Sequence, residues 1–335
     1  MKEILDRLIQ GRDLSRDEMR GVFGALMNGE LADAPMAAFL VALECKGITS
    51  EELAAAAEVM REKVTRIPIR VDAVDTCGTG GDGICTFNIS TATGIIAAGA
   101  GAYVAKHGNR TNTRKSGSAE AFAALGVNID ADVPTVARCI EEAHIGFCFA
   151  VKLHPAMKYA VGVRKALVVR TIFNLLGPMT NPAGVTRQII GVAREDLVEK
   201  IAKALGRLGT KRAMVIHGLN GLCDISISGP TKICELADGQ VRTILVEPKD
   251  FGITPAPLEE ITIESPQQSA EVIQSVLRGD KGPARDIAAV NAGAALMVAG
   301  LSPDITQGLK QAYESIDSGA AARALAKLIE ISQGK

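Results

Sequence analysis

The sequence predicts an α/β fold, with a small N-terminal all-helical domain and a large α/β domain whose central mixed, largely parallel sheet is flanked by helices. Residues 1–65 place apolar side chains at helical spacing throughout. From residue 74, short apolar runs alternate with helical segments, which is typical of parallel sheets. The chain has 335 residues and 47% of them are apolar, so it can form one large domain or two unequal ones.

The helical domain is predicted from its helix starts. Apolar residues at helical spacing follow a capping box at Ser15-Arg-Asp-Glu18, a proline at Pro35 and a second capping box at Thr49-Ser-Glu-Glu52. Pro68 marks a boundary, so we assign residues 1–68 to the helical domain and residues 69–335 to the α/β domain. Residues 155–185 look helical and loop-like, and we expect part of them to join the helical domain.

The elements of the α/β domain are predicted from their periodicity. Strands are expected at 71–76, 102–105, 147–150, 188–193 and 212–217, and helices at 90–100, 118–125, 134–143 and 196–208. Residues 225–247 are expected to form short antiparallel strands that begin at Ile225 and Ile227 and turn at Asp238-Gly239. Three helices are expected from Ser269 onward.

Composition and charge exclude several classes of protein. The formal net charge is −1, so no overall basic field attracts nucleic acid. We find no run of about 18 apolar residues, and the first residues lack the apolar core of a secretory signal, so we expect a cytoplasmic protein without a membrane partner. The seven cysteines include no C-x-x-C pair, and we expect reduced thiols and no zinc site.

A glycine-rich segment, Gly78-Thr-Gly-Gly-Asp-Gly83, follows the first expected strand and precedes a helix. Glycines let the backbone approach a ligand closely, and consecutive N–H groups can surround an anion. The helix that begins near Ser90 would direct its positive end to the same place. The alternative is a tight turn without a ligand. The spacing matches neither the P-loop nor the dinucleotide-binding pattern.

Two further polar segments are expected at the same sheet edge. Asn88-Ile-Ser-Thr91 supplies an amide and two hydroxyls; Ser90 or Thr91 can be an ordinary helix cap, or Ser90 can bind a hard cation held by phosphate. Lys106-His-Gly-Asn-Arg110 is expected just past a strand, where its two cations can neutralise phosphate or form a solvated basic turn. His107 is either part of this site or a packed residue.

Together these segments resemble the anthranilate phosphoribosyltransferases of tryptophan biosynthesis. The resemblance extends from the N-terminus to about residue 300. Its most specific pieces are Gly78–Gly83, Asn88–Thr91, Lys106–Arg110, Gly117-Ser-Ala119, His154-Pro-Ala-Met-Lys158, Arg170-Thr-Ile-Phe-Asn-Leu-Leu-Gly-Pro178 and Asn181-Pro-Ala183.

The resemblance implies transfer of the phosphoribosyl group of phosphoribosyl pyrophosphate (PRPP) to the amine of anthranilate, with Mg²⁺ as cofactor, and a homodimer formed through the helical domain. The PRPP site it implies consists of Gly78, Gly81, Asp82, Thr86, Asn88, Ser90, Thr91, Lys106, Asn109, Arg110 and Ser118. The implied anthranilate site consists of Gly78, Asn109 and Arg164. Ser90 and Asp224 are the implied Mg²⁺ ligands.

The sequence departs from this family at two places. The family usually has adjacent Asp and Glu for a second Mg²⁺, where this chain has Cys223-Asp224; a neutral thiol is a poor ligand for Mg²⁺. The family usually has two small hydroxyl residues where this chain has Thr113-Arg114, so Arg114 adds a cation that either supports the phosphate site or points to solvent.

Three other functions remain open from the sequence. A related phosphoribosyltransferase with a changed acceptor is permitted by Cys223 and Arg114. A pyrimidine-nucleoside phosphorylase resembles this family in its glycine loop, but Arg164 and the 154–158 segment favour anthranilate. An inactive relative that binds nucleic acid is disfavoured by the net charge of −1 and by the intact 106–110 segment.

Overall fold

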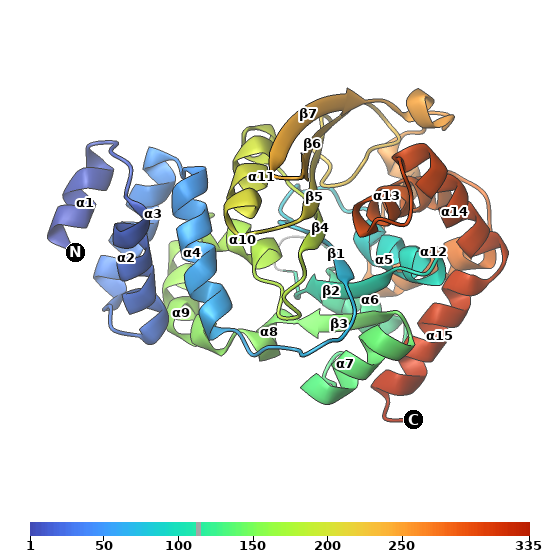
Figure 1. The fold of residues 1–335 in the computed structure, drawn as a ribbon, viewed down its shortest axis with the longest axis horizontal. Helices are drawn as coiled ribbons and strands as arrows, with labels where there is room; N and C mark the ends of the chain where they lie inside the picture. Colours follow the sequence, from blue (N-terminus) through green and yellow to red (C-terminus); the bar gives the residue numbers. More distant parts are fainter. Residues whose placement is uncertain (112–114) are drawn as a thin grey trace.

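The computed structural model describes residues 1–111 and 115–335, and its centre is a seven-stranded mixed sheet (Figure 1). The strand order is β3-β2-β1-β4-β5-β6-β7. The first five strands in this order are parallel, and β6 and β7 are antiparallel to their neighbours. The strands are β1 Ala73–Gly78, β2 Tyr103–Gly108, β3 Ile145–Phe149, β4 Arg187–Gly191, β5 Arg212–Gly218, β6 Thr231–Ala237 and β7 Gln240–Val246. The predicted mixed, largely parallel sheet is confirmed.

Helices cover both faces of this sheet because successive strand residues point to opposite faces. Ile189 of β4 belongs to one apolar core, and its neighbour Ile190 belongs to the other. The first face is covered by α5 Ile89–Gly99, α6 Ser118–Ala124, α12 Pro266–Arg278, α13 Pro283–Ala299, α14 Ile305–Asp317 and α15 Ala320–Ser332. On the second face lies α11 Val198–Arg207, while α7 Val133–Glu142 packs against β3.

The N-terminal helices form a separate group at one end of the molecule (Figure 1). They are α1 Lys2–Ile9, α2 Arg16–Asn28, α3 Asp33–Lys46 and α4 Ser50–Lys63. A later segment of the chain adds α8 Ala150–Leu153, α9 Lys158–Leu167 and α10 Phe173–Leu176. Both predicted capping boxes are present, at Ser15 and Thr49. The later segment packs on this group, since α9 contacts α2 and α3, and the rings of Phe23 and Phe173 lie 5.4 Å apart.

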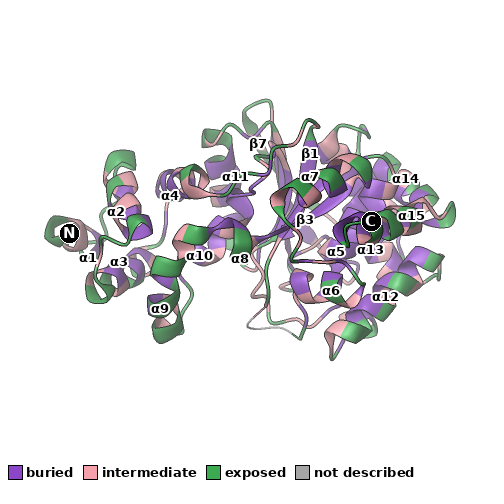
Figure 2. Cartoon of the chain, turned by 90° about the horizontal axis from the view of Figure 1, so that it is seen from below, coloured by how far each residue is buried: buried purple, intermediate pink, exposed green. Residues whose placement is uncertain are grey.

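Burial differs between the two parts of the fold. Figure 2 shows mostly buried residues in the sheet and in α5 and α13, and many exposed residues on α1 and α9. Within the described residues, we find no helix that is long and apolar enough to cross a membrane.

Three of the sequence-based expectations are wrong in detail. The second strand continues through Gly108, so Lys106 and His107 lie within β2 and not after it. No strand contains Ile225 or Ile227 in the described structure; the backbone N–H of Ile225 instead donates to Asn291 Oδ1 at 2.9 Å, which ties this segment to α13. Four helices rather than three form the C-terminal region, because left-handed glycines at 279, 300 and 319 separate α12, α13, α14 and α15.

Candidate active site

The glycine loop leaves the carboxyl end of β1, at the edge where open α/β sheets bind ligands. Gly78 pairs with Gly191 of β4, and a Cβ on Gly78 would lie 3.1 Å from the Gly191 carbonyl oxygen. Gly80, Gly81 and Gly83 have φ values of +62°, +80° and +75°, which other residues rarely adopt. The loop therefore requires glycine both for its approach to β4 and for its backbone conformation.

The far end of the glycine loop is held by the segment before α12. Ile263 N donates to Cys85 O at 2.8 Å, and Phe87 N donates to Ile261 O at 3.0 Å. Thr86, a predicted PRPP ligand, is buried and pairs with Thr262 in an isolated bridge. The loop thus has two fixed ends and a glycine-rich middle.

Asn88 caps α5. Its Oδ1 accepts a hydrogen bond from Thr91 N at 3.1 Å and also contacts the buried Thr91 hydroxyl. Of the two alternatives left by the sequence, capping by Ser90 or Thr91 is therefore wrong, because the helix begins at Ile89 and the preceding residue caps it. The Ser90 hydroxyl is not used as the cap and accepts from Lys106 Nζ at 3.2 Å.

Lys106 is the only lysine in the buried class within the part of the chain that the structure describes. Its Nζ donates to the Thr76 carbonyl oxygen and to Ser90 Oγ. A buried ammonium needs such partners because desolvation of an unpaired charge is costly. Lys106 therefore presents a fixed positive charge between the end of β1 and the start of α5.

Asp75 lies beneath this ammonium and was assigned no role from the sequence. Its Oδ2 accepts from Asn181 Nδ2 at 2.8 Å, and its Oδ1 accepts from His107 N at 3.1 Å. Burial raises the pKa of Asp75, and the nearby Lys106 charge and the Asn181 hydrogen bond oppose that rise. Asn181 also donates to Ala105 O at 2.8 Å, so this amide connects β1 and β2 below the site.

Three predicted ligands lie after β2 and at the start of α6. Ser118 Oγ donates to Asn109 O at 3.4 Å, and the Arg110 guanidinium lies 5.8 Å from the centre of the Phe149 ring. A Cβ on Gly108 would lie 2.1 Å from Ser118 Oγ, so the close approach of the start of α6 to the end of β2 depends on this glycine. Thr113 and Arg114 lie outside the described residues, and the role of Arg114 stays a prediction.

His107 is a packed residue, one of the two alternatives left by the sequence. Its Nδ1 lies 3.0 Å from Gly177 O and its Nε2 lies 3.1 Å from His154 Nε2. A carbonyl can only accept, so His107 carries its proton on Nδ1 and His154 donates from Nε2. Burial lowers the pKa of His107 to about 3 and that of His154 to about 4, so both rings are neutral.

The Cys223-Asp224 segment lies beside the glycine loop. Cys223 N lies 3.4 Å from Asp82 Oδ2, and Asp82 Oδ1 accepts from Ile84 N at 3.1 Å. A Cβ on Gly191 would overlap the Cys223 carbonyl oxygen. Within residues 1–111 and 115–335, we find no cluster of three or more His, Cys, Asp or Glu side chains arranged to hold a metal ion.

Arg164 lies in the last turn of α9, on the helical side of the molecule. Its guanidinium lies 5.2 Å from the centre of the Phe173 ring, and burial lowers its pKa. The link from this region to the glycine loop is made by Arg170, whose Nη2 donates to Gly81 O. Arg170 opens one of the motifs on which the resemblance rests, but sequence reasoning gave it no role.

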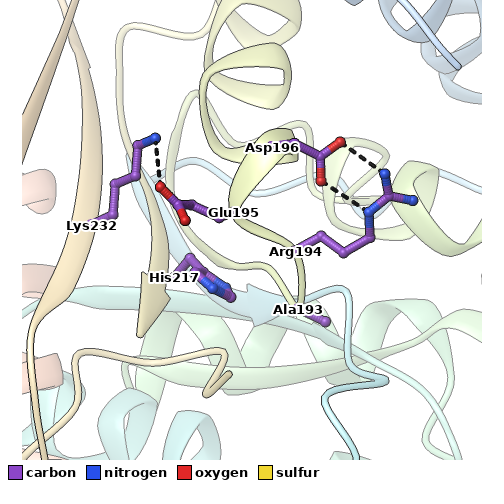
Figure 3. A pocket seen from close by; sticks show the side chains of 6 residues that line it. All are labelled: Ala193, Arg194, Glu195, Asp196, His217 and Lys232. Atoms are coloured by element: carbon purple, nitrogen blue, oxygen red, sulfur yellow. Dashed lines mark hydrogen bonds and ion pairs between the residues drawn. The ribbon is translucent and has the colours of Figure 1, made fainter. Parts of the chain in front are cut away.

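A separate cavity of about 470 Å³ opens beyond the ends of β4 and β5 (Figure 3). Its charged residues neutralise one another: Lys232 Nζ lies 3.2 Å from Glu195 Oε1, and Arg194 Nη2 lies 2.8 Å from Asp196 Oδ2. His217 Nδ1 donates to Val192 O at 2.9 Å. This cavity contains none of the residues predicted from the sequence.

The family comparison covers both parts of the chain. The α/β domain of a glycosyl transferase family matches residues 70–322, and the helical bundle domain of the same family matches residues 2–64. The anthranilate phosphoribosyltransferase of Thioalkalivibrio sulfidiphilus is 49% identical over 333 residues, which cover 99% of this chain and 98% of the relative. The chain belongs to the anthranilate phosphoribosyltransferase family.

Other anthranilate phosphoribosyltransferases agree in sequence and in fold. The Methylobacillus flagellatus enzyme is 47% identical over 99% of this chain and 98% of its own. The crystal structure of the Thermus thermophilus enzyme has a TM-score of 0.93 at 37% identity, covering 98% of this chain and 99% of that one. The Saccharomyces cerevisiae enzyme in complex with PRPP and Mg has a TM-score of 0.89 at 26% identity, covering 99% and 98%.

Proposed function

We propose that this chain transfers the phosphoribosyl group of PRPP to the amine of anthranilate at the sheet edge where β1, β2 and α5 meet. The observation that carries the proposal is the position of Lys106. Its buried ammonium reaches Ser90 at the positive end of α5, next to the glycine loop. A loop of backbone donors, a helix N-terminus and a fixed cation at one edge match a pyrophosphate group in charge and in geometry.

The PRPP ligands proposed here are the residues predicted from the sequence. The glycine loop supplies Gly78, Gly81 and Asp82; the start of α5 supplies Asn88, Ser90 and Thr91; β2 and α6 supply Lys106, Asn109, Arg110 and Ser118. Thr86 is buried in its bridge to Thr262, so we assign it to fixing the end of the loop as well as to the ligand set.

The oxygen donors at this edge suit Mg²⁺. Mg²⁺ prefers oxygen ligands and commonly takes only one or two from the protein, completing its shell with phosphate and water. The Ser90 hydroxyl would be such a ligand for one Mg²⁺, and the Asp224 carboxylate would be such a ligand for the second Mg²⁺ that the resemblance implies. When bound, Mg²⁺ neutralises negative charge that develops on the departing pyrophosphate.

The protein's own groups can lower the barrier to departure of pyrophosphate. The Lys106 charge and the loop N–H groups stabilise the negative charge that builds on this group, and they are in place before the substrate arrives. The aromatic amine of anthranilate is neutral at pH 7, so its attack on the ribosyl C1 requires little base catalysis. Positioning of the two substrates supplies much of the remaining acceleration.

For anthranilate, we propose binding at Gly78, Asn109 and Arg164. The Arg164 guanidinium lies against the Phe173 ring and is partly removed from water. Partial desolvation strengthens its attraction for a carboxylate, and a planar guanidinium can bind a carboxylate through two hydrogen bonds. Closure of the helical group, α1–α4 with α8–α10, on the α/β domain would bring Arg164, which lies in α9, towards the PRPP site and exclude water.

The helical domain is also the proposed dimer surface. Ile9 of α1, Val41 of α3 and Val161 of α9 are 74%, 37% and 40% exposed, and a second copy of the chain could cover these apolar side chains. Ile9→Asp together with Val41→Asp should convert a dimer to a monomer in size-exclusion chromatography with light scattering. A wild-type chain that elutes as a monomer would refute the proposed dimer.

We also propose a cytoplasmic location, in keeping with the seven free cysteines.

Loss of anthranilate fluorescence tests the activity directly. We expect the signal to decay when the protein is mixed with anthranilate, PRPP and millimolar Mg²⁺, and to stay constant when PRPP is omitted. No decay with folded protein contradicts the proposal. Replacing anthranilate with thymidine and phosphate tests the phosphorylase alternative in the same preparation.

A further inference from the structure

Arg170 joins two segments that are distant in sequence. Its Nη2 donates to the carbonyl oxygen of Gly81, 89 residues earlier in the chain. A Cβ on Gly81 would lie only 3.2 Å from the same nitrogen. Arg170 is exposed, so the packed core does not depend on its side chain. The contact therefore acts on the loop and not on the stability of the fold.

The hydrogen bond to Gly81 determines which way one loop peptide group points. A peptide bond is planar and trans, so its C=O and N–H point in opposite directions. With the Gly81 carbonyl held by Arg170, the N–H of Asp82 is directed to the opposite side of the loop. Gly80 and Gly81 both have positive φ, and glycine backbones rotate at low cost. Without the guanidinium, this peptide group can turn over and remove one donor from the anion-binding set.

Arg170 also follows directly on the helix that carries Arg164. α9 ends at Leu167, and Val168 then adopts a φ of 55°, an unusual conformation for a β-branched residue. Val168 is 86% exposed, so no packing accounts for this conformation. Only Val168 and Val169 separate the end of α9 from Arg170, so a short segment joins the helix to the Gly81 contact.

We propose that Arg170 is a positioning residue that orients the glycine loop for the pyrophosphate group and couples the PRPP site to the acceptor helix α9. This inference rests on the proposed function. It predicts that the two substrates influence each other's binding through Arg170.

Arg170→Gln tests the proposal, with Lys165→Gln as the matched control. Lys165 is an exposed cation on α9 and has no contact with the loop among those described. Loss of a charged hydrogen bond should raise the KM for PRPP about tenfold while kcat changes less than about threefold. Arg170→Lys can still donate to the carbonyl and should restore part of the affinity. Lys165→Gln should match the wild type.

Titration calorimetry with pyrophosphate and Mg²⁺ measures the coupling without turnover, because pyrophosphate and anthranilate do not react. In the wild type we expect anthranilate to change the pyrophosphate Kd at least about threefold, and in Arg170→Gln we expect a ratio near one. A wild-type ratio of one, or an unchanged KM for PRPP in active Arg170→Gln, overturns the inference. A wild type that consumes no anthranilate refutes the proposed function instead.

Discussion

The two halves of the PRPP site differ in how their polar groups are held. In the buried half, Lys106 donates to the Thr76 carbonyl oxygen, and Asn181 donates to the Asp75 carboxylate and to a backbone carbonyl oxygen, before any substrate is present. In the exposed half, the glycine loop and Arg110 rely on left-handed glycines and on single contacts at the surface. The comparison indicates that the positive charge for binding, the Lys106 ammonium, is fixed in the interior by its hydrogen bonds. The glycine loop instead supplies backbone N–H donors whose orientation depends on contacts at the surface.

Lys106→Met should break the buried half most severely. The buried Asp75 carboxylate would lose the nearby Lys106 charge, which offsets the cost of its burial. We therefore expect the free energy of unfolding to fall by about 3 kcal/mol. The substrate would lose a fixed cation, so kcat/KM should fall at least about 100-fold. Chemical denaturation and steady-state rates measure the two effects.

Lys115→Met is the control for this substitution. Lys115 is an exposed cation of the same region, 3.3 Å from Glu264, so its loss should change neither quantity appreciably. Equal effects of the two substitutions would show that burial of the cation does not matter.

Asn181→Ala should lower the stability of the fold more than it weakens the binding of PRPP. It removes the amide that donates to Asp75 and to the Ala105 carbonyl, so we expect a loss of about 2 kcal/mol in the free energy of unfolding. Because Asn181 lies below the site, the KM for PRPP should change less than it does in Arg170→Gln. A larger rise in KM than in Arg170→Gln would contradict the division into two halves.

Acid should weaken the buried region through the histidine pair. His107 and His154 have pKa values lowered to about 3 and about 4 from 6.5, so the unfolded chain binds more protons below pH 6.5. Their contribution to stability is therefore complete above pH 6.5 and is lost as the pH falls, by about 2 kcal/mol for His154 at pH 5. Thermal unfolding between pH 7 and pH 5 measures this loss.

His154→Gln provides the comparison for the pH effect. It should flatten the dependence of Tm on pH. Asp75 and Lys106 are present in both proteins, so their contributions cancel when the two curves of Tm against pH are subtracted. An identical pH slope in the two proteins would show that His154 is not buried neutral.

The sequence was sufficient for the parts of the site that local rules determine. Capping boxes, the glycine loop and the alternation of strands and helices follow from nearby residues, and they predicted the mixed sheet and the edge at which Lys106 lies. The resemblance then supplied ligand roles that chemistry alone left open. Its motifs also contained Arg170 and Asn181, without a role for either.

What the sequence did not predict depends on contacts between distant segments. Asn181 reaches Asp75 across 106 positions of the chain, and His154 reaches His107 across 47. Neither pairing has a periodicity or a turn signature that a linear pattern can show. The strand end at Gly108 was also missed, because a lysine in a buried strand is plausible only when its partners, Thr76 and Ser90, are known.

Glu195→Gln should have the smallest effect on stability and on catalysis. It tests whether the effects of the other substitutions are specific to the proposed site. Glu195 lines the cavity of Figure 3 and pairs with Lys232 at 3.2 Å, with its side chain 55% exposed. Exposed ion pairs contribute little because water screens them, so we expect Tm to change by at most about 2 °C. KM for PRPP and kcat should stay within about twofold of the wild type, since the cavity contains none of the proposed ligands. A change in KM of the size expected for Arg170→Gln would show that the donor site extends beyond β4 to this cavity.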